Sequence, residues 1–162
     1  MKKPIKTFKG LTLVEVVTYL AIFAFIFISI IEFVISVKQT NDTALDRSNI
    51  ERAMVFVMNH LNDSFDQSNT IVVNESVFNS DNGILRLNSP TLILEYSLSN
   101  GQIRFRDNGV YYGVSDPELR VDRLFFEQVY NRSNQIVGVR VTIKMSGDRE
   151  LERELTSVFL LR

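Results

Sequence analysis

The longest feature of the hydrophobic pattern is an apolar run close to the N-terminus. The 21 residues from Leu11 to Ile31 are apolar or mildly polar apart from Glu15, and they contain neither Gly nor Pro. At a rise of about 1.5 Å per residue they form a helix of about 31 Å, which matches the roughly 30 Å hydrocarbon core of a bilayer. The pattern therefore predicts a membrane-spanning helix with a carboxylate near its start.

A second periodic pattern follows. Residues 36–49 are polar on almost every side, and no Gly or Pro occurs from Leu11 to Asn82, so the helix can continue. Apolar residues then recur at three- and four-residue steps: Ile50, Ala53, Met54, Val57, Met58, Leu61 and Phe65. Such a stripe is typical of an amphipathic helix packed on a core, and a lipid or coenzyme pocket is the less common alternative.

After Asn69 the period shortens to two. Apolar and polar residues alternate over residues 91–98 and 137–145, and a last strand is expected within residues 151–161. Asn-Gly pairs at 100–101 and 108–109 predict tight hairpin turns. These features indicate an antiparallel β-sheet with one face on the amphipathic helix. We therefore predict an α+β fold, in which a long N-terminal helix spans the membrane with its first half and packs on the sheet with its second.

The composition and charge distribution narrow the class of protein. The chain has 162 residues, a length that suits one domain, and 45% of them are hydrophobic. It has no cysteine, which excludes disulfides and thiolate metal sites. Four lysines, at positions 2, 3, 6 and 9, precede the first acidic residue and predict a cytoplasmic N-terminus. The apolar run is longer than the roughly 7–15 residues of a secretory signal core, and no Ala-x-Ala-like site follows it. The segment should stay attached.

Glu15 needs a partner, because an acidic group deep in a bilayer costs on the order of 2.5–3.5 kcal/mol. Lys9 lies six residues earlier and is poorly placed for a helical pair. Cleavage after Gly10 would make the Leu11 amine a cation four residues before Glu15, on the same helix face. In an assembly of parallel helices, the carboxylate could instead reach the amine of a neighbouring chain.

Residues 1–37 resemble the N-terminus of a type IV pilin-like precursor. The resemblance rests on a basic leader ending in Lys9-Gly10, a hydrophobic Leu11, the sequence Thr12-Leu13-Val14-Glu15 and the long apolar run. It implies that a prepilin peptidase cleaves between Gly10 and Leu11 and methylates the Leu11 amine, and that Glu15 guides subunit assembly. Leu11 replaces the commoner Phe, and Glu32 stands where many major pilins have a helix-kinking proline, which favours a minor subunit.

The resemblance also implies an organisation and partners. The leader is residues 1–10, the transmembrane and assembly helix residues 11–37, and the soluble pilin-like α+β domain residues 38–162. The chain would cross the inner membrane once, with the leader cytoplasmic and the C-terminal domain outside, before it enters a pilus or pseudopilus fibre. Its partners would be prepilin peptidase, minor and major pilin-like subunits, the inner-membrane assembly platform and membrane lipid.

The C-terminal half loosely resembles the J or W classes of minor pilins and pseudopilins. This likeness implies a subunit that helps to initiate or cap a type IV pilus-like or type II secretion fibre. The alternative is a tip receptor of a competence or adhesion pilus that binds DNA or a surface ligand. Without residues 1–10 the formal net charge falls from −1 to −5, which is unfavourable for phosphate contacts. Arg104 and Arg106 share a strand face beside Asp107, so DNA binding would be confined to a local patch.

Catalytic signals are weak throughout the sequence. His60 has no cysteine or second histidine with which to bind zinc, and we expect it on a helix surface. Residues 79–83, Asn-Ser-Asp-Asn-Gly, lack the glutamate of a calcium loop and are expected to form a turn. The charged residues 115–122 suggest a solvated loop. No phosphate loop or nucleophile elbow occurs, so we expect no enzyme activity, cofactor or metal.

Overall fold

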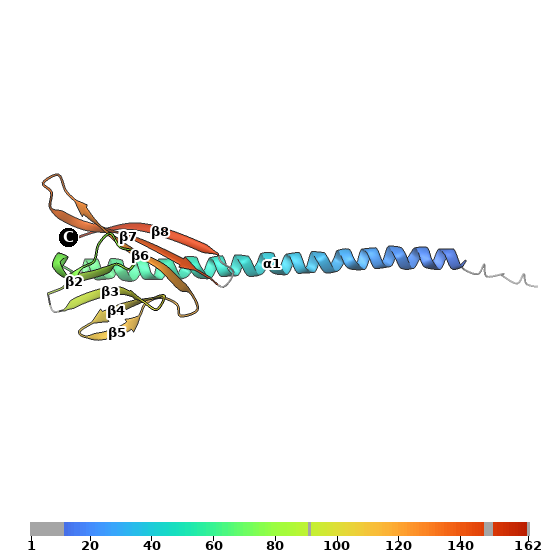
Figure 1. Ribbon diagram of the computed structural model, residues 1–162, viewed down its shortest axis with the longest axis horizontal. Helices are drawn as coiled ribbons and strands as arrows, with labels where there is room; N and C mark the ends of the chain where they lie inside the picture. Colours follow the sequence, from blue (N-terminus) through green and yellow to red (C-terminus); the bar gives the residue numbers. More distant parts are fainter. Residues whose placement is uncertain (1–11, 91, 148–150, 162) are drawn as a thin grey trace, which may run out of the picture. The chain divides into compact units, whose positions relative to one another are not determined.

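The computed structural model describes residues 12–90, 92–147 and 151–161. Its first element is helix α1 (Leu13–Asp66), which has 54 residues and confirms the predicted helical continuation (Figure 1). Neither Gly nor Pro interrupts it, so no residue removes a hydrogen bond from its interior. The chain divides into two compact units, one ending at Asp42 and the other beginning at Thr43, and α1 contributes residues to both.

The first unit contains the apolar part of α1. Every described residue from Thr12 to Asn41 is exposed, including large apolar side chains such as Phe25, at 73%, and Phe33, at 68%. Within the described ranges, α1 is the one helix with the length and apolar composition of a membrane span. The length and composition of α1 therefore support the prediction of a candidate membrane helix near the N-terminus.

The second unit contains two antiparallel β-sheets. One has the order β1 (Thr70–Ile71), β2 (Ile84–Asn88), β3 (Ile93–Ser99), β4 (Gln102–Asp107) and β5 (Val110–Gly113), with a short 3-10 helix, η1 (Val73–Glu75), between β1 and β2. The other consists of β6 (Arg120–Tyr130), β7 (Ile136–Ser146) and β8 (Glu152–Leu160). The α+β class and the antiparallel pairing are confirmed.

Two sequence-based expectations need correction here. We expected a single sheet, but β6 does not pair with β5; backbone groups of residues 79–83 bond to β6 instead. Gly83 N donates to Leu124 O at 2.8 Å, and Asn79 N donates to Phe126 O at 2.9 Å. Residues 115–122 were expected to form a loop, but residues 120–122 begin β6. The side chain of Val121 is buried in the core, which favours a strand over a solvated loop.

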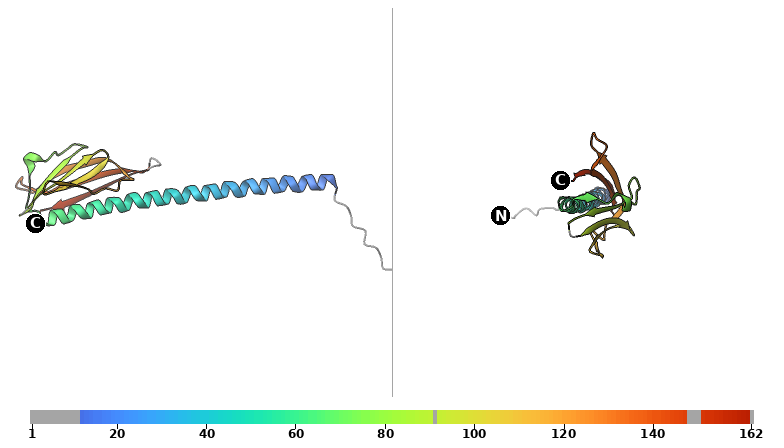
Figure 2. Two further views of the ribbon diagram at one scale, coloured as in Figure 1. Left: turned by 90° about the horizontal axis from the view of Figure 1, so that it is seen from below. Right: turned by 90° about the vertical axis from the view of Figure 1, so that its left-hand side faces the viewer.

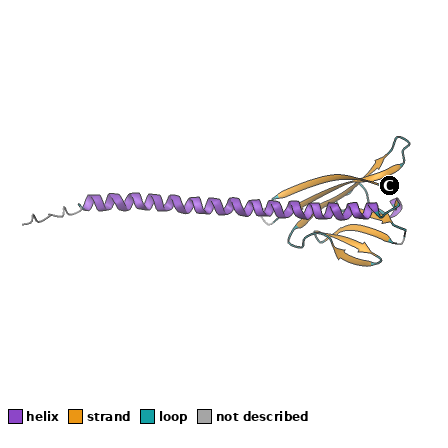
Figure 3. Cartoon of the chain, turned by 180° about the vertical axis from the view of Figure 1, so that it is seen from behind, coloured by secondary structure: helices purple, strands orange, loops and turns teal. Residues whose placement is uncertain are grey.

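The two sheets lie side by side over the C-terminal part of α1. Figures 1 and 3 show β6–β8 along one flank of this part of the helix and β2–β5 along the other. Figure 2 (left) shows both sheets over the same side of it. Not every apolar side chain of this part of α1 is covered, since Val55 and Phe56 are 53% and 58% exposed.

The predicted apolar stripe of α1 forms the centre of the core. Its buried members are Ile50, Met54, Val57, Met58, Leu61 and Phe65, with Ala53 partly buried. They pack with inward residues of both sheets, among them Tyr96, Ile103 and Val141. The ring of Phe65 stacks on that of Phe159 with centroids 5.3 Å apart. The interpretation of the stripe as core packing is confirmed.

The predicted turns have the expected backbone conformations. Asn100 and Gly101 have φ of 53° and 72°, and Asn108 and Gly109 have φ of 47° and 85°. Positive φ at both central residues is the requirement of a type I′ hairpin turn. In the turn at residues 79–83, Asp81 forms an ion pair with Arg123 at 2.6 Å. The sequence predicted all three turns.

The second unit should fold without the apolar part of α1, because its core is formed from its own residues. A fragment that begins at Lys38 is expected to be soluble and to show mixed helix and strand by circular dichroism. A single cooperative thermal transition would support this expectation. A fragment that is unfolded on its own would contradict it.

Candidate assembly site at the start of helix α1

Glu15 is held by the residue that precedes the helix. Thr12 lies immediately before Leu13, the first helical residue. The backbone N–H of Glu15 donates to Thr12 Oγ1 at 3.3 Å. In return, Glu15 Oε2 accepts from the backbone N–H and from the hydroxyl of Thr12, each at 3.2 Å. This reciprocal arrangement is a capping box, which satisfies donors that the first turn of a helix leaves without partners.

The cap explains part of how the chain tolerates an acidic group here. The N-terminus of a helix carries partial positive charge, and a carboxylate in its first turn gains about 0.3–1 kcal/mol from it. Both contacts use Oε2; within the described ranges, Oε1 of Glu15 has no hydrogen-bond partner. One oxygen of the carboxylate is therefore available to a cation.

The other predicted site residues, Gly10 and Leu11, lie outside the described residues. Pairing of Glu15 with the Leu11 amine therefore stays a prediction. The sequence reasoning used Thr12 only as part of the family motif and missed its contact with Glu15. The signal was present, because Thr followed three residues later by Glu before an apolar run is the signature of a capping box.

Three hydroxyl groups of the first unit are satisfied within α1. The hydroxyl groups of Thr18, Ser29 and Thr40 donate to the carbonyl oxygens four residues earlier, at 2.8, 3.0 and 2.9 Å. Such bonds suit a lipid environment, where no water is available to hydroxyl groups. Glu32 differs, because the described part of the chain gives it no hydrogen bond and no ion pair.

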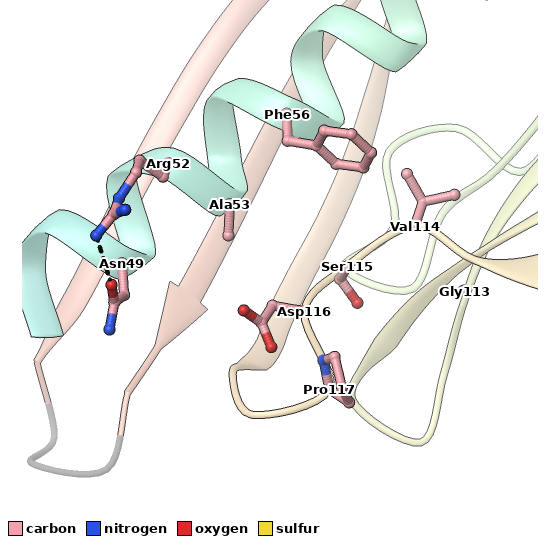
Figure 4. A pocket seen from close by; sticks show the side chains of 9 residues that line it. All are labelled: Asn49, Arg52, Ala53, Phe56, Gly113, Val114, Ser115, Asp116 and Pro117. Carbon is pink, nitrogen blue, oxygen red and sulfur yellow. Dashed lines mark hydrogen bonds between the residues drawn. The ribbon is translucent and has the colours of Figure 1, made fainter.

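A groove of about 520 Å³ lies in the second unit, between α1 and the segment after β5. Its lining residues are Asn49, Arg52, Ala53, Phe56, Gly113, Val114, Ser115, Asp116 and Pro117 (Figure 4). The guanidinium of Arg52 donates to Asn49 Oδ1 at 2.8 Å, and Asp116 Oδ1 accepts from the backbone N–H of Glu118 at 3.0 Å. The two charged side chains of the lining are thus tied to their own segments.

His60 is not the surface residue that we expected. It is half-buried, and its Nδ1 lies 2.6 Å from the hydroxyl of Tyr96. Its ring packs edge-on against Phe105 with centroids 4.7 Å apart. The Tyr96 hydroxyl also lies 2.6 Å from Ser64 Oγ and donates to His60 O at 3.1 Å. The histidine therefore connects α1 to β3 and β4, and helical periodicity alone could not show this.

This environment predicts a loss of stability in acid. Burial lowers the pKa of His60 below its ordinary value, and the nearby Asp63 carboxylate opposes the shift only partly. The unfolded chain then binds a proton more readily than the folded chain, so stability falls as the pH drops below about 6.5. The thermal midpoint of the Lys38–Arg162 fragment should fall more between pH 7 and pH 5 than that of its His60→Leu variant. Equal falls would contradict the prediction.

The outer face of the five-stranded sheet carries a row of paired charges. Arg86, Glu95, Arg106 and Tyr111 lie opposite one another on four successive strands. Arg86 Nε lies 2.6 Å from Glu95 Oε2, and Arg106 Nη1 lies 3.8 Å from the same oxygen. Glu75 forms an ion pair with Arg86, and the Arg106 guanidinium lies over the ring of Tyr111. We call these five residues the charge row.

The charge row affects the predicted arginine patch. Arg106 is engaged by Glu95 and Tyr111. Arg104 is exposed and lies opposite Ser97 and Gly113, which carry no charge. Of the two arginines that would form a DNA-binding patch on this face, one is therefore already paired. Compared with protein-family models, with curated proteins and with solved structures, the chain matches none.

Proposed function

We propose that the chain is a minor pilin or pseudopilin, a structural subunit that helps to initiate or cap a type IV pilus-like or type II secretion fibre. One observation carries the proposal: a capped carboxylate, Glu15, opens a long helix whose apolar side chains are exposed. The basic leader and Gly10, three residues before Leu13, supply the rest of the argument.

In this proposal, the exposed apolar surface of α1 is covered by a different environment in each of two states. Lipid covers it while the subunit is a membrane monomer, and helices of neighbouring subunits cover it in the fibre. The available oxygen of Glu15 would gain a strong partner if it met an α-amine. That amine would belong to Leu11 of the same chain or of a neighbour, and the second pairing would fix the axial register between subunits.

The proposed partners follow from these two states. Prepilin peptidase would cleave between Gly10 and Leu11 and methylate the new amine. Minor and major pilin-like subunits would contact the helix, and the inner-membrane assembly platform would receive the processed chain. The leader would lie in the cytoplasm and the second unit outside the membrane, as the four lysines of residues 1–10 favour.

Processing is the direct test of the proposal. Coexpression with a prepilin peptidase should shorten the chain to one that begins at Leu11 and carries a methyl group on its amine. Mass spectrometry of the intact protein measures both changes. A chain that still carries residues 1–10 under conditions in which a known prepilin is cleaved would falsify the assignment.

A substitution at Gly10 separates cleavage from membrane insertion. Gly10→Val should block cleavage, because a branched side chain keeps the peptidase from a close approach to the backbone. Insertion should be unchanged, since the lysines and the apolar run that direct it remain. Gly10→Ala is the matched control and should retain more cleavage than Gly10→Val. If the valine variant no longer fractionates with membranes, the leader has a role other than the one proposed.

A further inference from the structure

Two carboxylates of α1 are closer together along the helix axis than an ordinary bilayer core is thick. Glu15 and Glu32 are the first acidic residues of the chain, and both belong to α1. Seventeen steps of about 1.5 Å place them about 25 Å apart along the helix axis. The hydrocarbon core is about 30 Å thick, and tilting the helix shortens the projected separation further. A spanning α1 therefore brings at least one of them to the edge of the core or into it.

Glu15 has hydrogen-bond partners at the start of α1, whereas Glu32 has no cation one helix turn away. Glu15 has its cap with Thr12. The residues three and four positions from Glu32 are Ile28, Ser29, Ile35 and Ser36, and none of them is a cation that could pair with it across a helix turn. Ser29 already donates to Phe25 O, and Lys38 lies six residues away, on another face. The free energy of the Glu32 carboxylate is therefore lowest where it contacts water.

We propose that Glu32 sets the depth of α1 in the bilayer. Its carboxylate lies at the boundary of the hydrocarbon core farther from the N-terminus, and Glu15 lies at the opposite boundary with its cap. The embedded stretch is then Val16–Ile31, which contains no charged residue and measures about 24 Å. This length is short for a bilayer core, so the arrangement favours an upright helix and a locally thin membrane.

The residues directly after Glu32 would enter the hydrocarbon core if the carboxylate were absent. Phe33, Val34, Ile35 and Val37 are apolar and 51–68% exposed. Without Glu32, the uncharged stretch would run from Val16 to Val37 and measure about 33 Å, long enough to fill the core by itself. The helix would then slide by about one turn and take these side chains into lipid. Glu32 instead holds them at the level of the head groups.

This inference requires only that α1 spans a bilayer, so it stands or falls separately from the pilin assignment. The chain has no cysteine, and single cysteines can report depth directly. Full-length Ser29→Cys, Ser36→Cys and Thr40→Cys chains would be expressed without prepilin peptidase or pilin-like partners. Membrane fragments open on both sides are then treated with a charged maleimide, and labelling is normalised to that in detergent.

The wild-type background should give protected Ser29→Cys and labelled Ser36→Cys and Thr40→Cys. Adding Glu32→Leu should slow the labelling of Ser36→Cys about tenfold or more, because the acidic group no longer excludes this turn from the core. Glu32→Asp, which keeps the charge, should label as the wild type does, and Thr40→Cys should be labelled in every background. Protection of Ser36→Cys in the wild-type background, or an unchanged labelling rate in Glu32→Leu, would overturn the proposal.

Discussion

Replacement of Glu15 by alanine should leave α1 in the membrane but sharply reduce its incorporation into a fibre or tip complex. Insertion should be unchanged or easier, because the variant removes an acidic group that is costly to place in lipid. Incorporation should fall because the available oxygen of Glu15 is the acceptor for an α-amine in our proposal. The loss belongs to the assembled state, where two charges that have left water depend on each other.

The capping box requires that this result be separated from a simple loss of helix structure. Glu15→Gln keeps an oxygen that can accept from the backbone N–H of Thr12, but it removes the charge. Thr12→Ala keeps the charge but removes the hydroxyl contacts of the cap, at about 0.5–2 kcal/mol of local helix stability. If the ion pair drives assembly, Glu15→Gln should behave as Glu15→Ala does, and Thr12→Ala should have the smaller effect.

Crosslinking measures incorporation without a complete fibre. A photoreactive group placed between Leu13 and Val17 should form crosslinks to coexpressed pilin-like subunits in the wild-type chain, and far fewer in Glu15→Ala and Glu15→Gln. Equal yields in all three chains would remove the register role. A loss in Thr12→Ala equal to that in Glu15→Ala would show instead that the cap, rather than the charge, is what assembly needs.

The largest expected effect on folding is that of Gly138→Ala. Gly138 lies on β7 opposite Leu160 of β8. A Cβ atom there would come closer than 3.0 Å to the carbonyl oxygen of Phe159 and to the side chain of Leu160. The backbone of β8 cannot move away without loosening the stacking of Phe159 on Phe65. We expect a loss of about 3 kcal/mol in the free energy of unfolding, the upper end for an overpacked core.

Gly113 supplies the matched control. It also lies in a strand, β5, but a Cβ atom at this position would meet nothing within 4 Å. Gly113→Ala should therefore change the free energy of unfolding by less than about 1 kcal/mol. Urea denaturation of the Lys38–Arg162 fragment measures both variants. Equal losses for the two would show that the crossing at Gly138 is not tight.

The sequence predicted those elements whose cause is local. The helix, its buried stripe from Ile50 to Phe65 and the two Asn-Gly hairpins depend on periodicity and on backbone preferences that single residues carry. Strand β6 was missed because its alternation is interrupted. A register shift falls between Val121 and Arg123, and three large apolar residues follow in succession at positions 124–126.

The features that the sequence did not reveal depend on contacts between distant segments. Alternation placed Glu95 on the outward face of its strand, but only the structure shows that Arg86 and Arg106 cover it and leave it 6% exposed. His60 was assigned to the helix surface because nothing within the helix predicts the approach of Tyr96, 36 residues later. The capping box differs from these features, because the spacing of Thr12 and Glu15 alone predicts it.

The charge row has a consequence for how this protein can diverge. Glu95 is 6% exposed, so loss of Arg86 leaves a buried carboxylate with one cation fewer, whereas replacing the whole group by apolar residues is often tolerated. Single substitutions at Arg86 or Glu95 should therefore be purged by selection, while exchanges at both positions persist. In an alignment of descendants of this chain, positions 86, 95 and 106 should covary, and position 104, on the same strand as 106, should drift independently.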